Sequence, residues 1–317
     1  MQKNELVIGH NNFKYRVKKD WAEFTPEQYP VNDCHEMVMS KNGLLYLLTN
    51  ETRNNVLVYS KDGIVKASWG KTYPGAHGLT LSDENGEEFL YITDTVRHQV
   101  IKTNLEGKEL MILDYPQEIS LYTSANEYKP TETAIASNGD IYVTDGYGLQ
   151  FVIQYDARGN YIRHWGGKGD GIDQFNCVHG ITVDNRNAEP SLLITSRNHN
   201  VLKRFSMSGE YLNTISLPGS FNCRPVINGK NVYSAVFRSE HNKNLRSGYI
   251  TIIDENDRVV SSPGGTEPVY INSVLQPQKQ EGSTFIHPHD VCVDKDENLY
   301  IPQWDSDKTY PLMLERI

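Results

Sequence analysis

Short runs of alternating apolar and polar residues recur along the chain, and they come in pairs separated by turns rich in Asp, Asn and Gly. Residues 77–82 and 89–94, for example, flank the turn at 83–86. Strict alternation over a few residues is typical of half-buried β-strands, and such pairs are typical of hairpins. No window of useful length shows helical periodicity. The pattern therefore predicts an all-β protein.

The hairpins fall into six similar units whose openings are 42 to 67 residues apart. They cover residues 35–49, 77–94, 132–145, 179–196, 222–236 and 289–303, and the fifth unit is degenerate. In most units a third alternating strand follows, as at 98–104 and 152–156, and another turn leads to a fourth. Four strands per repeat at this spacing predict the blades of a six-bladed β-propeller.

The two ends of the chain complement each other. The sixth unit runs out after its third strand, at residues 311–317, while residues 13–17 form an unassigned strand. We expect the N-terminal strand to form the outer strand of the last blade, which would close the ring and cover an open edge. Because there is no linker or low-complexity segment, residues 1–317 are expected to form a single domain.

The net charge and the lack of long apolar runs argue against two classes of partner, nucleic acid and membrane. The net charge of −9 argues against nucleic acid, because phosphate binding needs a basic surface. No apolar run approaches the ~18 residues that cross a bilayer, and residues 1–5 carry no signal core. We therefore expect a soluble chain without a membrane partner and leave its compartment open. The four cysteines form no C-x-x-C pair and are expected in the core.

Propeller geometry indicates which residues can meet. The first strand of each blade lines the central channel, and the second strand returns the chain to the face where the first began. Residues that open strand one and residues just after strand two should therefore share a face. We also expect the longest insertion, about residues 261–284, to form a loop on that face.

The residues expected to open the six inner strands are all polar. They are His35, His77, Glu132, His179, Asn222 and His289. His77, His179 and His289 lie in alternate blades, ~120° apart in a six-bladed ring. Three imidazoles with an open fourth position suit zinc or another divalent transition metal. His35 would be a fourth ligand or a substrate contact, and the alternative is a polar channel of hydrogen-bonded histidines with bound water.

Two residues after the second strands suggest chemistry on the same face. Tyr147 would bring a phenol, an acid or a base, close to the metal. Arg197 would hold a substrate carboxylate. Asp145 is as well explained by hydrogen bonds within its own turn, and Arg97 by a solvated loop.

The blades resemble NHL repeats, most clearly at residues 161–176 running into 178–184. Within that group the chain resembles the peptidyl-α-hydroxyglycine α-amidating lyase family over about residues 70–305. The motifs that carry this resemblance are Ala76-His-Gly-Leu79 with Ile92-Thr-Asp94 and Gln99-Val100, Lys129-Pro-Thr131 with Val143-Thr-Asp-Gly-Tyr147, Phe175 with Val178-His179, Ser196-Arg197, and Pro288-His-Asp-Val291.

The resemblance implies a catalytic zinc on His77, His179 and His289 and a structural calcium near Asp290. It also implies catalytic roles for Tyr147 and Arg197. Members of that family cleave the C–N bond of a peptidyl-α-hydroxyglycine, releasing a peptide amide and glyoxylate.

The chain departs from the family where the substrate would be held. The family's arginine after the second strand of blade one has only a shifted counterpart, Arg53, and the methionine before the third zinc histidine is replaced by His287. After Tyr147 the chain continues Gly148-Leu-Gln-Phe151 instead of the family's Cys and Asn-Ser-Arg-like run. We expect Arg53, His35, Glu132 and His287 to contact the substrate.

These observations predict a metal-dependent lyase of the amidating type that acts on a small polar substrate. One alternative is a metal-dependent lyase, hydrolase or epimerase for a carbohydrate or keto-sugar. Another is a non-catalytic scaffold for a protein partner, a common role of NHL propellers. A scaffold does not need histidines spaced around its axis, so the histidines favour an enzyme.

Overall fold

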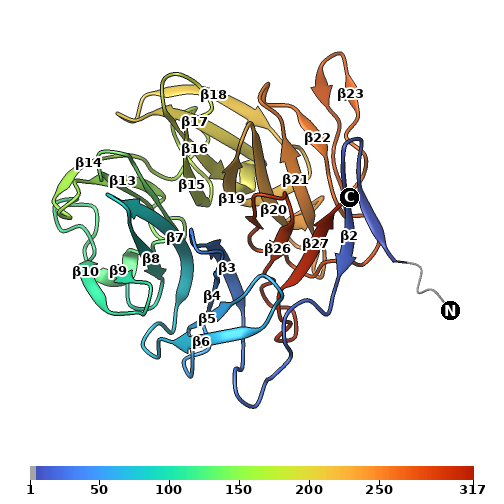
Figure 1. The fold of residues 1–317 in the computed structure, drawn as a ribbon. Coiled ribbons are helices and arrows are strands. Elements are labelled where there is room, and N and C mark those ends of the chain that lie inside the picture. Colours follow the sequence, from blue (N-terminus) through green and yellow to red (C-terminus); the bar gives the residue numbers. More distant parts are fainter. Residues whose placement is uncertain (1–4) are drawn as a thin grey trace.

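Six antiparallel sheets surround a central axis in the computed structural model, which describes residues 5–317 (Figure 1). Residues 1–4, part of the N-terminal segment in which we found no signal core, lie outside the described residues. Between residues 5 and 317, no helix is long and apolar enough to cross a membrane. The all-β, six-bladed architecture expected from the repeats is confirmed.

The first five blades have four strands each, with the innermost strand first in sequence. Blade 1 contains β3 (Cys34–Met39), β4 (Leu45–Thr49), β5 (Val56–Tyr59) and β6 (Val65–Trp69). Blade 2 contains β7 (Ala76–Glu84), β8 (Glu87–Asp94), β9 (Gln99–Asn104) and β10 (Glu109–Leu113). Blade 3 contains β11 (Glu132–Ile135), β12 (Ile141–Thr144), β13 (Phe151–Tyr155) and β14 (Tyr161–Gly166). Blade 4 contains β15 (Val178–Asp184), β16 (Ser191–Ser196), β17 (Val201–Ser206) and β18 (Tyr211–Ser216). Blade 5 contains β19 (Ser220–Asn228), β20 (Asn231–Ser239), β21 (Tyr249–Ile253) and β22 (Val259–Ser261).

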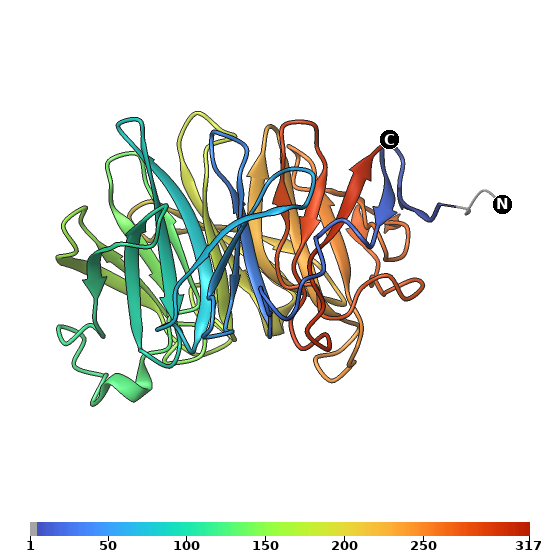
Figure 2. The same ribbon diagram turned by 60° about the horizontal axis from the view of Figure 1, so that its bottom comes forward.

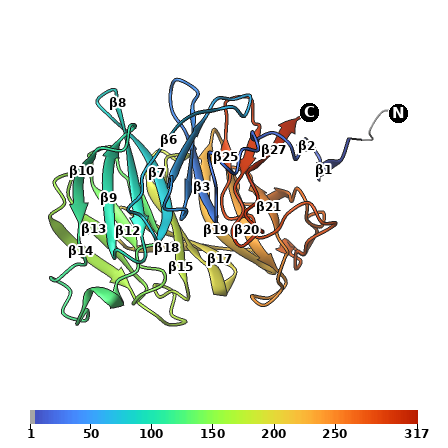
Figure 3. The same cartoon turned by 90° about the horizontal axis from the view of Figure 1, so that it is seen from below.

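The last blade combines both ends of the chain. Its inner strands are β25 (Cys292–Val293), β26 (Leu299–Ile301) and β27 (Leu312–Arg316), and its outer strands are β2 (Phe13–Lys18) and β1 (Val7–His10). Tyr15 pairs with Arg316 and is fully buried. Figures 2 and 3 show β2 lying beside β27 at the edge of the ring. The predicted closure by the N-terminal strand is confirmed, with β1 as an additional fifth strand.

The hydrophobic core lies mainly between neighbouring blades. Leu48 of blade 1 packs with Leu79 and Ile92 of blade 2, and Val152 of blade 3 packs with Ile194 of blade 4. These side chains are the apolar members of the alternating pattern. Because each sheet is buried on both faces, the central strands read as nearly continuous apolar runs.

The insertion at 261–284 lies only partly on the expected face. The backbone amides of Gln278 and Gln280 donate to the Pro218 carbonyl and the Ser239 hydroxyl, at the end of blade 5 where its inner strand opens. Residues 270–275 form a hairpin of β23 (Tyr270–Ile271) and β24 (Val274–Leu275) at the outside of the ring (Figure 1). Leu275 packs with Ile215 and Val259 of two outer strands. The prediction was therefore wrong for residues 270–275, whose apolar side chains pack on the outer strands of blades 4 and 5. Two short 3₁₀ helices, η1 (Ala125–Glu127) and η2 (Arg197–His199), complete the described elements.

Candidate functional site

A β-bulge at the opening of the inner strand recurs in blades 1, 2, 4 and 5. In blade 1, Cys34 pairs with Thr49 and Glu36 pairs with Leu48, which leaves His35 as the extra residue. The pairings in the other three blades are likewise shifted by one residue. A bulge interrupts the alternation of a strand and re-aims its side chains. This lets two consecutive side chains of one strand reach the axis.

Strand pairing aligns one residue of each blade in a ring at the opening of the channel, which we call the upper ring. It consists of His35, His77, Thr131, His179, Cys223 and His289. Our assignment was wrong by one residue in blades 3 and 5, where it placed Glu132 and Asn222. The pairing of Thr133 with Val143 matches that of Leu79 with Ile92, so Thr131 stands where blade 2 has its histidine.

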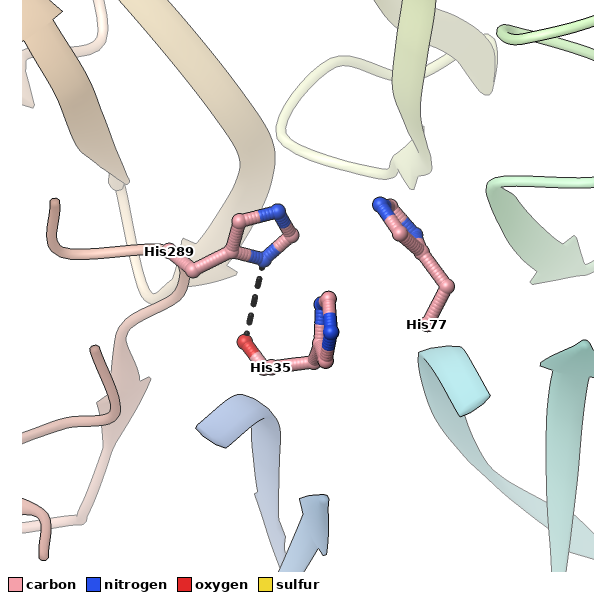
Figure 4. A group of neighbouring side chains, drawn as sticks. All are labelled: His35, His77 and His289. Carbon is pink, nitrogen blue, oxygen red and sulfur yellow. Dashed lines mark hydrogen bonds between the residues drawn. The ribbon is translucent and has the colours of Figure 1, made fainter. Parts of the chain in front are cut away.

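The four histidines of the upper ring converge on the axis. The centroid of the His77 imidazole ring lies 4.8 Å from that of His179, 5.0 Å from that of His289 and 5.0 Å from that of His35. One nitrogen from each of His35, His77 and His289 lies within 4.8 Å of the others (Figure 4). His179 completes the cluster, with its Nε2 3.2 Å from Nε2 of His77. The structure therefore brings together all three predicted ligands and adds His35.

Hydrogen bonds orient two of these imidazoles for metal binding. Nδ1 of His77 donates to the Thr131 carbonyl at 2.8 Å, and Nδ1 of His289 donates to the His35 carbonyl at 3.1 Å (Figure 4). Each Nε2 then carries the lone pair, the usual arrangement of a histidine that binds a metal. Burial lowers the pKa of His35 to about 3 and holds the pKa of His77, His179 and His289 well below 6.5. Neutral, converging imidazoles fit a divalent transition metal.

Tyr147 and Arg197 lie beside the histidines, as the sequence predicted. The Tyr147 hydroxyl is 3.0 Å from Nε2 of His77 and 3.1 Å from Nε2 of His179. The residue as a whole is 43% exposed to the cavity, but its hydroxyl lies among the histidines, and the loss of water there raises the pKa of this phenol, while Arg197 opposes the shift. Nη1 of Arg197 is 3.5 Å from the same hydroxyl, and its Nη2 donates to Sγ of Cys223 at 3.0 Å. Tyr147 therefore holds its proton at neutral pH in the metal-free protein.

A second ring lies one residue further along the inner strands, and we call it the lower ring. It consists of Glu36, Gly78, Glu132, Gly180, Arg224 and Asp290. The three carboxylates are fully buried, and Arg224 is 7% exposed. Burial raises the pKa of Glu36 and Glu132 against the opposing effect of Arg224. Glu132 thus belongs to a buried charged layer and does not contact the cavity, contrary to our expectation.

Arg224 occupies the position where a structural cation would bind. Its Nη2 and Nε donate to the Asp290 carboxylate at 2.6 and 3.2 Å. Nη1 donates to the Leu79 carbonyl at 2.6 Å, and Nη2 donates to the Met37 carbonyl at 3.3 Å. Calcium needs six to eight oxygen ligands, and here the guanidinium already engages these oxygens. The residues present do not fit the calcium expected near Asp290, which faces Arg224 and not the histidines.

A cavity of about 670 Å³ opens above the upper ring. One repeat position, at or shortly after the end of the second strand, lines it in all six blades: Asn50, Thr95, Gly146, Arg197, Phe237 and Trp304. The propeller argument about which residues share a face is therefore confirmed. A second cavity of about 550 Å³ lies against the lower ring and is lined by Arg224, Met37 and Val291. The charged layer separates the two cavities.

Two predicted substrate contacts lie outside the cavity. The side chain of Arg53 is 65% exposed and paired with Glu51. His287 lies behind the cavity wall, where its ring packs against Phe237 and Trp304. Its Nε2 accepts a hydrogen bond from the Arg246 backbone. His287 therefore supports the wall, and Arg53 has no place at the site.

The sequence analysis missed part of the wall because blade 5 is degenerate. Phe237 and Arg238 lie near the end of its second strand, β20, where Phe237 has the repeat position that Arg197 has in blade 4, and both line the cavity. Cys177, which we expected in the core, also lines the cavity. Extending the comparison of second-strand ends to the degenerate fifth blade would have identified Phe237 and Arg238.

Burial of four neutral histidines makes the stability of the metal-free protein depend on pH. Unfolded histidine has a pKa of about 6.5, so below that pH the unfolded chain binds more protons than the folded chain. We expect full stability above about pH 6.5 and a loss of about 1.4 kcal/mol per pH unit from His35 as the pH falls toward 3, with further losses from His77, His179 and His289 over the range below 6.5. Urea unfolding with EDTA at several pH values measures this slope. His35→Asn should make the slope shallower and the exposed His241→Asn should not, so equal slopes would contradict the prediction.

Fold and cavity together define a class: a six-bladed β-propeller with a histidine-lined cavity on its axis. The chain belongs to the family described as 6-bladed beta-propeller, which residues 93–289 match. NHL repeat-containing protein 3 of Homo sapiens is 28% identical over 180 residues, covering 54% of this chain and 51% of that protein. A probable peptidyl-α-hydroxyglycine α-amidating lyase of Caenorhabditis elegans is 36% identical over 86 residues, covering 27% and 24%. The chain therefore spans about half the length of the human relative and less of the lyase.

Solved structures with the same fold also include lyases. A streptogramin B lyase structure superposes with a TM-score of 0.60 at 13% identity, covering 91% of this chain and 95% of that one. Virginiamycin B lyase of Staphylococcus aureus, solved in a catalytically inactive form with quinupristin, gives 0.57 at 15% identity, covering 99% and 97%. At this level of identity the likeness shows the fold alone.

Proposed function

We propose that the axial cavity is the active site of a metal-dependent lyase. One juxtaposition supports this most: the Tyr147 hydroxyl lies within 3.1 Å of Nε2 of both His77 and His179, at the base of an open cavity that Arg197 also lines. An acid–base group, candidate metal ligands and a cation for a carboxylate are the parts such a reaction needs. Relatives that are amidating lyases point the same way.

His77, His179 and His289, with His35 beside them, are the residues that would hold a divalent transition metal, zinc foremost. When bound, such an ion stabilises negative charge on a substrate oxygen. The chain itself supplies the proton transfer and the substrate's orientation. In the proposed reaction a substrate hydroxyl loses its proton, a carbonyl forms, and the neighbouring C–N or C–O bond breaks. Tyr147 passes its own proton to the departing nitrogen or oxygen and takes up the proton of the substrate hydroxyl, so that no proton is gained or lost overall. Arg197 holds an acidic group of the substrate.

The substrate differs from that of the amidating lyases in this proposal. The family's arginine in blade 1 has no counterpart in the cavity, because Arg53 points outward to Glu51. His287 stands in the wall and does not reach the cavity. In this proposal Tyr147 and the histidines correspond to residues of the amidating lyases, whereas the residues expected to hold the substrate do not.

Metal analysis and a turnover assay test the proposal together. Purified protein should hold close to one equivalent of a divalent transition metal, and the double variant His77→Asn/His289→Asn should lose it. The control His98→Asn, which lies outside the cluster, should keep it. The metal-loaded protein is then given a peptidyl-α-hydroxyglycine, and glyoxylate is measured.

The metal content and the glyoxylate assay together distinguish an amidating lyase, a metal enzyme with another substrate, and a non-catalytic scaffold. Glyoxylate release above background would identify the amidating reaction. Bound metal without glyoxylate would point to another substrate, with carbohydrates and keto-sugars tested next. Absence of both metal and turnover would contradict the proposed function and favour an interaction scaffold.

A further inference from the structure

The cavity carries positive charge in an otherwise acidic protein. Lys168, Arg197 and Arg238 line it, and none of its described lining residues is Asp or Glu. The chain as a whole has a net charge of −9. A cleft lined by one sign of charge attracts ligands of the opposite sign.

Arg197 and Arg238 have no acidic partner within residues 5–317. Arg197 bonds instead to Sγ of Cys223 and, at 3.3 Å, to the Asn222 carbonyl. Arg238 donates through Nη1 to the Asn242 carbonyl, and its Nε is buried without any partner there. Most other arginines, such as Arg186 and Arg204, are paired with carboxylates. The two cavity arginines are therefore free to bind an anion.

One aromatic ring positions both guanidinium groups. The guanidinium carbon of Arg197 lies 4.4 Å from the centroid of Phe237, and that of Arg238 lies 4.5 Å from it. Cation–π contacts fix the orientation of each group. Because they share one ring, the two guanidinium carbons are at most about 9 Å apart, and their positive fields add at the cavity wall, which favours a bound anion.

The rim of the cavity offers a different chemistry. Asn176, Asn198 and Asn242 line it and form a chain, in which Asn242 donates to Asn198 at 3.2 Å and Asn198 donates to Asn176 at 2.9 Å. Side-chain amides both donate and accept, which suits the hydroxyl groups of a sugar. Trp304 adds a part-exposed aromatic ring to the wall.

We propose that the substrate is a sugar acid whose carboxylate is bound jointly by Arg197 and Arg238, with its hydroxyl groups on the asparagine rim. The proposal rests on the proposed function for the position of the reacting hydroxyl, next to Tyr147. Arg238 is then a specificity residue contributed by blade 5, in place of the missing arginine of blade 1. Two charge-assisted contacts to the carboxylate distinguish the acid from the neutral sugar.

Calorimetric titration of the metal-free protein with D-galacturonate and D-glucuronate, against D-galactose and D-glucose, tests the proposal. Each uronate should bind at least about tenfold more tightly than its neutral sugar. Arg238→Gln should weaken uronate binding at least about tenfold without changing the melting temperature. Arg53→Gln, an exposed arginine outside the cavity, should leave binding unchanged.

Three results would overturn the proposal: uronates binding no more tightly than neutral sugars, Arg238→Gln binding uronates like the unaltered protein, or malonate binding as tightly as the uronates. The last would reveal a general anion site without sugar recognition. Because binding is measured without metal or turnover, it is separable from the proposed chemistry. Uronate binding in a protein that catalyses nothing would contradict the lyase and leave the sugar-acid site in place.

Discussion

Tyr147→Phe should lower kcat by about a hundredfold to ten-thousandfold, the usual contribution of a positioned acid or base. Phenylalanine keeps the ring that faces the cavity and removes only the hydroxyl that contacts His77, His179 and Arg197. The melting temperature and the metal content should therefore stay the same. Turnover of the peptidyl-α-hydroxyglycine or of a uronate-containing substrate measures the effect.

The matched control for Tyr147 is Tyr211→Phe, which removes an exposed hydroxyl bonded to Thr214 in blade 4. It should leave kcat unchanged. If Tyr147→Phe kept full activity, Tyr147 would have no role in proton transfer. If it lost the metal as well, its role would be structural.

Arg224→Met should lower the free energy of unfolding by about 3–5 kcal/mol, the cost of removing one partner from a buried ion pair. Methionine is similarly long but leaves Asp290, Glu36 and Glu132 buried without their cation. Urea unfolding at pH 7 measures the loss. Adding Asp290→Asn and Glu36→Gln should restore part of the stability, because these changes remove the unpaired charges.

Arg246→Met is the control, since its partner Asp307 and Arg246 itself are both exposed. It should hardly change the unfolding midpoint, and an equal loss in both variants would contradict the role of Arg224. The effect of added calcium on stability is a second measurement of the role of Arg224. Arg224→Ala vacates the oxygens of Asp290, Met37 and Leu79, so millimolar calcium should stabilise that variant and not the unaltered protein.

The repeat pattern was enough to predict the fold because alternation, turn residues and spacing all point to the same blade. It also predicted the partnership of β2 with β27, since one end lacked a strand that the other end offered. Four site residues, His77, His179, Tyr147 and Arg197, were brought together as expected. The repeat motifs of blades 2, 3 and 4 place the strand openings and the second-strand ends on one face, although blades 2 and 4 carry a bulge at the opening.

The pattern failed at the openings of blades 3 and 5. In blade 3 the pairing is regular but begins at Glu132, so the ring residue Thr131 lies just before the paired strand. In blade 5 register shifts around Asn222 place Cys223 in the ring instead. Arg224 was missed because its importance comes from side chains of three other blades, which no local sequence pattern connects. That zinc occupies the histidine cluster, and that the chain is one domain, stay predictions.

The buried charged layer closes the central channel, so the cavity above the histidines opens on one face of the propeller only. Arg224 and its three carboxylates stand between the cavity above the histidines and the one on the opposite face. In a lyase of this shape, substrate enters and both fragments leave by the same route. The fragment bound deeper, against the histidines, must depart last. That fragment should therefore inhibit competitively with substrate, whereas the outer fragment, which leaves first, should inhibit in a way that excess substrate does not overcome.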